Sequence, residues 1–146
     1  MKVFLHFVVL VVAISCQSEE EVPFELPPKA AAILTGDSTK VWKLAKRYNN
    51  GTRMNMGDCF LVHRQHFSKS NTFRTSSEGR SDCGDDLGGN WSFVKDQNGF
   101  NYLRVSSDQI PELMNIEENY KLFKIQHLSD TLITLKTSNS SPIIGR

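Results

Sequence analysis

Short runs of alternating apolar and polar residues, separated by turn sequences, dominate the chain after Gly36. Successive side chains of a strand point to opposite faces, so this alternation is typical of half-buried β-strands. No helical periodicity longer than about two turns occurs in this part of the sequence. The pattern therefore predicts an all-β fold, an antiparallel barrel or sandwich built from short strands.

We expect about seven or eight strands at this spacing. Asn49-Asn50-Gly51 predicts a hairpin after the first strand, because Asn and Gly both tolerate positive φ. Residues 76–89 are expected to form a loop, and residues 108–114 either one helical turn or a loop. The expected strands are residues 40–47, 59–67, 71–75, 90–95, 100–106, 120–127 and 131–137.

A short helix is expected in front of these strands. Pro28 suits the first turn of a helix, and the three alanines within residues 29–34 favour helical structure. Gly36 can end the helix, because glycine adopts positive φ without steric cost. The helix is therefore expected over about residues 29–34.

The N-terminus has a different composition. Lys2 precedes an apolar stretch, residues 3–14, which only His6 interrupts. A positive charge followed by a short apolar run is typical of a secretory signal. The stretch is shorter than the roughly 20 residues that span a bilayer. A buried core helix is the alternative, which the polar, proline-containing residues after it disfavour.

The junction at Ser15-Cys16 resembles the lipobox of bacterial lipoproteins. The resemblance implies a signal peptide over residues 1–15 and acylation of Cys16, which would anchor the protein in the lipid bilayer. Residues 18–21, one serine and three glutamates, are similar to the export signal of Bacteroidota-type lipoproteins. This implies an outer-membrane lipoprotein that is exposed on the cell surface.

Residues 16–29 are acidic and rich in proline, which indicates a flexible tether. Residues 30–146 have the length of one domain, which we expect to be monomeric. This domain carries 15 basic and 12 acidic side chains without a basic patch. Such a small and dispersed excess does not indicate a nucleic-acid partner.

Several short motifs together resemble the lipocalin-like domain of small Bacteroidota-type surface lipoproteins, over about residues 30–137. They include Leu34-Thr35-Gly36, Trp42-Lys43-Leu44, Gly89-Asn90-Trp91 and Leu132-Ile133-Thr134. The resemblance implies a small up-and-down β-barrel with the short N-terminal helix closing one end. It implies no activity, because that family is largely without one.

Acylation of Cys16 would leave Cys59 and Cys83 as a pair in an oxidising compartment, where disulfides form and persist. Two buried free thiols are the alternative. Six aromatic residues are candidates for either a filled core or the lining of a ligand pocket, because a small barrel can hold side chains or one small ligand. They are Trp42, Phe73, Trp91, Phe93, Tyr102 and Phe123.

Other chemistry-bearing residues form no recognisable site. His63 and His66 are three apart on an expected strand, so they point to opposite faces and cannot easily share a metal. The acids at Asp82, Asp85 and Asp86 do not have EF-hand spacing, which favours a solvated loop. No serine lies in a Gly-x-Ser-x-Gly elbow. We therefore expect no catalytic residues, metal or cofactor.

Three hypotheses of function follow. The first is an anchored, non-catalytic lipoprotein whose barrel binds a small apolar or amphipathic ligand, or an envelope partner. The second is an interaction module of an envelope complex with a filled core. An enzyme acting on surface glycan or lipid is a third, weaker hypothesis.

Overall fold

The computed structural model describes residues 21–137. Its helical elements are short: α1 (Ala30–Thr35), α2 (Asp58–Val62), α3 (Ile110–Met114) and the 3-10 turn η1 (Ser81–Cys83). The larger strands are β1 (Thr39–Lys43), β4 (Arg64–Ser68), β5 (Thr72–Ser76), β6 (Gly88–Lys95), β7 (Asn101–Ser106), β8 (Tyr120–Leu128) and β9 (Ile133–Thr137). A separate pair consists of β2 (Tyr48–Asn49) and β3 (Thr52–Arg53).

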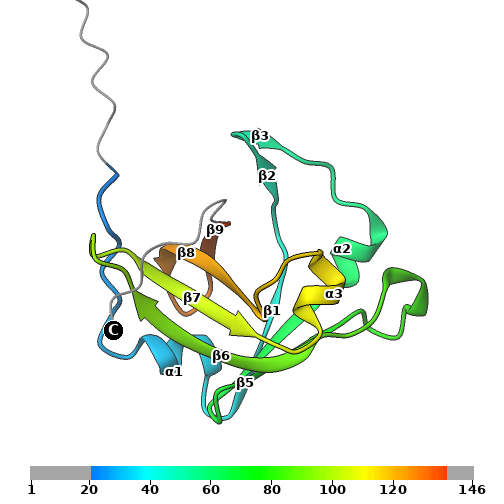
Figure 1. Cartoon of the computed structure of the whole chain (residues 1–146), viewed down its shortest axis with the longest axis horizontal. Coiled ribbons are helices and arrows are strands. Elements are labelled where there is room, and N and C mark those ends of the chain that lie inside the picture. Colours follow the sequence, from blue (N-terminus) through cyan, green and yellow to red (C-terminus); the bar gives the residue numbers. More distant parts are fainter. Residues whose placement is uncertain (1–20, 138–146) are drawn as a thin grey trace, which may run out of the picture.

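The seven larger strands form one antiparallel sheet in the order β1-β4-β5-β6-β7-β8-β9. This sheet curls into a half-barrel, and the β2–β3 pair stands away from it (Figure 1). Within residues 21–137, β1 and β9 are the two edge strands. The prediction of a mostly-β chain with a curled, up-and-down antiparallel sheet is therefore confirmed.

Helix α1 lies where the two ends of the curled sheet approach each other. It contacts β1, β4 and β8. The Trp42 indole N–H donates to the Leu34 carbonyl at 2.9 Å. The Lys40 ammonium donates to the carbonyls of Ile33 at 2.9 Å and Asp130 at 2.6 Å, so it joins β1 to the turn between β8 and β9. The expected short helix is confirmed, and Gly36 follows it with a φ of 63°.

The hydrophobic core lies on the concave face of the sheet. Strand register places the alternate residues of neighbouring strands side by side: Phe67 pairs with Phe73, and Trp91 pairs with Val105. The buried cluster comprises Ala30, Leu34, Phe67, Phe73, Trp91, Leu103, Val105, Ile125 and Leu128. The alternation of apolar and polar residues along each strand thus produces one apolar face, as the sequence pattern predicts.

Two of the expected strands are wrong in part. Residues 59–62 form helix α2 instead of the start of a strand, and β4 begins only at Arg64. The run Phe60-Leu61-Val62 is continuously apolar, and such a run does not distinguish a strand from a helix. The first expected strand stops at Lys43, and residues 44–47 leave the sheet to reach the small hairpin. Its Asn50-Gly51 turn is confirmed, with φ values of 47° and 77°.

Residues 21–29 differ from the expected flexible tether, because they pack along the sheet. Phe24 and Leu26 are half-buried against the core. The Asn101 side-chain amide donates to the Phe24 carbonyl at 2.9 Å. Ion pairs join Glu21 to Lys124 at 2.9 Å and Glu25 to Lys95 at 3.6 Å. We call residues 21–29 the strap.

Candidate functional site

The concave face of the half-barrel is filled by packed aromatic side chains. The Trp91 ring packs edge-on against Phe93 and Phe67, with centroids 5.4 and 6.3 Å apart. The Phe67 and Phe73 rings stack at 6.2 Å. The Trp91 indole N–H donates to the Ser68 carbonyl at 2.9 Å, so this buried polar group is satisfied. These contacts give the concave face a packed aromatic core.

Five of the six aromatic candidates gather on this face. Phe73 and Trp91 belong to the buried cluster, and Trp42, Phe93 and Phe123 pack against it. Tyr102 does not join them, because it alternates with Leu103 and points to the opposite face. The list omitted Phe67, which is 3% exposed. Phe67 lies within the expected strand 59–67, and this position could have identified it as a core candidate.

Tyr102 has its own buried environment on the convex side. Its hydroxyl donates to Asp96 Oδ2 at 3.0 Å. Burial raises the pKa of Tyr102 to about 12, and the hydrogen bond to the Asp96 carboxylate acts in the same direction. The phenol therefore stays neutral and ties β7 to the β6–β7 turn.

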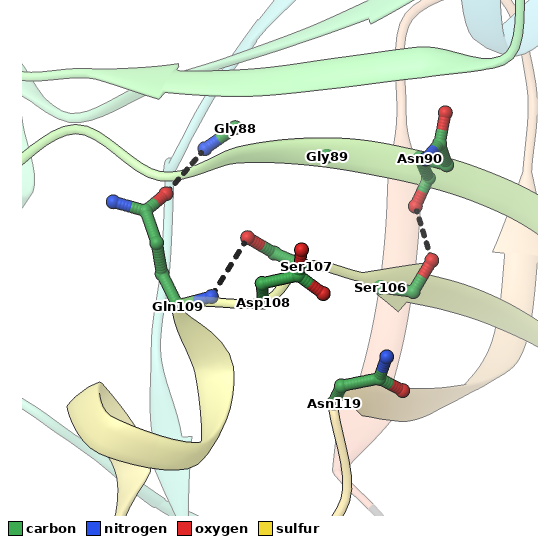
Figure 2. A pocket seen from close by; sticks show the side chains of 8 residues that line it. All are labelled: Gly88, Gly89, Asn90, Ser106, Ser107, Asp108, Gln109 and Asn119. Carbon is green, nitrogen blue, oxygen red and sulfur yellow. Dashed lines mark hydrogen bonds between the residues drawn. The ribbon is translucent and has the colours of Figure 1, made fainter.

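A polar pocket of about 380 Å³ opens where β6 and β7 meet α3. Figure 2 shows the hydrogen bond from the Gly88 N–H to Gln109 at one end and that from Ser106 to Asn90 at the other, of 3.3 and 3.4 Å. Asp108 is the one carboxylate in its lining. The remaining lining residues are Gly89, Ser107 and Asn119. Hydroxyl, amide and backbone groups do not suit an apolar ligand.

The largest exposed feature is the segment between β1 and β4. We call residues 43–61 the arm. Every one of these residues is exposed except Met56, which is half-buried. Tyr48 is 57% exposed and Leu61 is 55% exposed. The arm therefore presents large apolar side chains that the fold itself does not bury.

The arm is fixed at its base by three contacts. The Met54 N–H donates to the Arg47 carbonyl at 2.8 Å, which extends the β2–β3 pairing by one step. The Arg47 guanidinium lies 4.8 Å from the centre of the Phe60 ring. A disulfide joins Cys59 of α2 to Cys83 of η1. The predicted pairing of the two cysteines is thus seen, and it ties the end of the arm to the loop after β5.

The histidines do not assemble into a metal site. His66 Nε2 hydrogen-bonds the Ser76 hydroxyl at 3.0 Å, and the His127 ring lies 6.0 Å from Phe24. Burial lowers the pKa of His63 and of His66, which favours the neutral rings. In the part of the chain that the structure describes, no three potential ligand side chains come together around one point.

The acidic loop is occupied by an ion pair. Arg80 donates to both carboxylate oxygens of Asp82, at 2.9 and 2.7 Å. This interaction lowers the pKa of Asp82 to about 2. Asp58, which the disulfide brings towards this loop, also raises the pKa of Arg80. Asp82 is therefore paired with an arginine, and both side chains are exposed.

Comparison with protein families, curated proteins and solved structures finds no match for this chain. Over residues 21–137, the helices are all too short or too polar to traverse a lipid bilayer. The choice of a candidate functional surface therefore depends on geometry alone. The arm is that candidate, because the packing of the fold does not account for its exposed apolar side chains.

Proposed function

We propose that the chain is a membrane-anchored, non-catalytic interaction module of the cell envelope. In this proposal Cys16 is acylated, the protein is exposed on the cell surface, and the half-barrel holds a contact surface in place. Cys16 and the signal peptide lie outside the described residues. The lipobox resemblance supports this part of the proposal.

One observation carries the proposal: the side chains that would line a ligand cavity pack against one another. The concave face holds the aromatic cluster around Trp91, and residues of α1 and of the strap pack against it. Ligand pockets need several hundred Å³ of mostly apolar space. The pocket of about 380 Å³ lies outside this core, where β6 and β7 meet α3, and its lining is polar. A partner-binding role therefore fits better than a lipid-binding role.

The likeness to lipocalin-like domains belongs to the same proposal. The consecutive order of β4 to β9 supports it, since up-and-down barrels pair neighbours in sequence. The hydrogen bond from the Lys40 ammonium to the Asp130 carbonyl joins β1 to the β8–β9 turn, which supports closure of the barrel between the edge strands β1 and β9. A binding role for a small apolar ligand is the alternative hypothesis, and it would require the core to open.

An enzyme acting on glycan or lipid has less support. Glycoside hydrolysis commonly needs two carboxyl groups about 5–10 Å apart across the scissile bond. The lining of the polar pocket contains one carboxylate, that of Asp108. This leaves an interaction module as the function that the geometry supports best.

Crosslinking in cells of the source organism tests the proposal. A photoreactive residue is placed in turn at exposed positions spread over the domain, such as Tyr48, Lys69 and Leu132. We expect at least one position to form a discrete adduct with one envelope protein, while positions on other faces do not. If all exposed positions give no adduct, or all give the same smear, the interaction function is wrong.

A further inference from the structure

The arm carries a strong local excess of positive charge. Residues 43–61 include four basic side chains, Lys43, Lys46, Arg47 and Arg53, and one acid, Asp58. Among the ion pairs of the described residues, none involves these four cations. Asp58 faces the neighbouring Arg80. Within residues 21–137, the four cations of the arm therefore have no ion-pair partner.

Apolar and cationic groups alternate on both faces of the small hairpin. Tyr48 pairs with Arg53 across the strands, so their side chains share one face. The next pair, Arg47 and Met54, lies on the opposite face, where Arg47 also covers the Phe60 ring. Aromatic residues, Met and Arg are the residue types enriched in protein interfaces.

We propose that the arm docks an acidic protein partner, and that Tyr48 and Arg53 lie at the centre of the contact. This inference rests on the proposed interaction function. Cations without internal counter-charges fit a surface rich in Asp and Glu, since complementary potentials steer association and fix register. The exposed rings of Tyr48 and Phe60 would enter apolar pockets among those acids.

The distribution of side chains favours a protein over a membrane surface. A membrane-binding segment separates its apolar and cationic groups onto opposite faces, so that one face can enter the bilayer. The hairpin instead places an arginine beside an apolar residue on each face. Inserting either face into lipid would carry a guanidinium with it, which is costly.

A partner would also stabilise the arm itself. A two-stranded hairpin alone in water is only marginally stable. Here β2 and β3 have two residues each and bury none. The disulfide of Cys59 and the Arg47–Phe60 contact hold the base. Binding would bury the tip between these fixed points, with a smaller loss of entropy than an unanchored loop would pay.

Charge reversal of the full-length protein tests the inference. Lys46→Glu with Arg53→Glu reverses the charge of two of the four cations of the arm. Lys69→Glu is the control, at an exposed cation in the β4–β5 turn. None of these three side chains takes part in an ion pair or a cation–π contact within residues 21–137, so all variants should form the Cys59–Cys83 disulfide. Photo-crosslinkers at Tyr48 and Leu61 report docking, and one at Leu132 reports another surface.

We expect adducts from Tyr48 and Leu61 with one protein, through a peptide of that protein with net negative charge. The yield should fall about tenfold or more in the Lys46→Glu/Arg53→Glu variant but not in Lys69→Glu. It should also fall in about 1 M salt, where the Debye length is about 3 Å. Reversing acids of the crosslinked peptide to Lys should restore the adduct with the charge-reversed arm.

Three results would overturn the inference. Adducts from Leu132 alone would leave the interaction function standing and place the contact elsewhere. If charge reversal does not change the adduct yield, the inference that the partner is acidic is wrong. Arm-dependent binding of the protein to anionic phosphatidylglycerol vesicles, with no protein adduct, would assign the arm to the membrane. Failure to crosslink from every surface would contradict the interaction function itself.

Discussion

At the scale of single residues, Gly89 shows how closely β6 approaches β7. A Cβ at this position would overlap the Ser106 carbonyl oxygen and touch the Phe73 ring at 3.0 Å. Backbone atoms cannot move aside as a flexible side chain can. The close approach of the β6 and β7 backbones therefore requires glycine at this position, two residues before the buried Trp91.

We predict that Gly89→Ala lowers the free energy of unfolding by about 1–3 kcal/mol or more, the range of overpacked cores. Gly88→Ala is the matched control, because a Cβ at Gly88 meets nothing within 4 Å. Urea unfolding followed by tryptophan fluorescence measures both. Equal stability of the two variants would mean that β6 and β7 are farther apart at this point.

Tyr102 gives a prediction about pH. Its pKa rises from 10.0 to about 12 on folding, chiefly through burial. The neutral phenol is thus favoured by the folded state, and its stabilising contribution is complete below pH 10 and is lost as the pH rises through 12. Ultraviolet titration should show a phenolate transition near pH 12 that Tyr102→Phe removes and Tyr48→Phe leaves in place. Retention of the transition in Tyr102→Phe would refute the assignment.

At the scale of elements, the strap ties the N-terminal side of the chain to the sheet. Phe24 contributes a half-buried ring, and Val22 beside it is 84% exposed. We predict that Phe24→Ala lowers the free energy of unfolding by ~1–2 kcal/mol, since full burial of a Phe contributes about 1.5–3.

Val22→Ala is the control for the strap and should change stability by less than about 0.5 kcal/mol. The NMR signals of the Asn101 side-chain amide add a direct readout, because its hydrogen bond to the Phe24 carbonyl should loosen in Phe24→Ala alone. If Phe24→Ala is as stable as Val22→Ala, the strap does not belong to the folded unit.

The strands were predictable from sequence to the extent that their alternation was clear. Strands β6 to β9 lie within two residues of their expected bounds, since Trp91, Leu103 and Ile125 mark one buried face. Apart from its Asn50-Gly51 turn, the arm was not predictable, because Leu44 extends the apolar alternation of β1 although it is exposed. The packing of the strap was missed because Phe24 stands among prolines and acids, and tertiary contact overrides such a composition.

At the scale of the whole molecule, the proposal joins an anchor to a filled half-barrel. Each buried CH₂ of an acyl chain contributes about 0.8 kcal/mol, so two or more chains hold a protein stably. We predict that wild-type protein and Gln17→Ala stay in washed membranes, whereas Cys16→Ala appears as soluble or unprocessed protein. Cys16→Ala that is still quantitatively membrane-bound would contradict acylation as the anchor.

We propose that side chains fill the interior, so that the molecule acts through its surface. Native mass spectrometry of the full-length protein from its own envelope tests this proposal. We expect a single mass that the chain and its acylated cysteine explain. A further small molecule, retained one to one with the native protein and released when the protein unfolds, would contradict it.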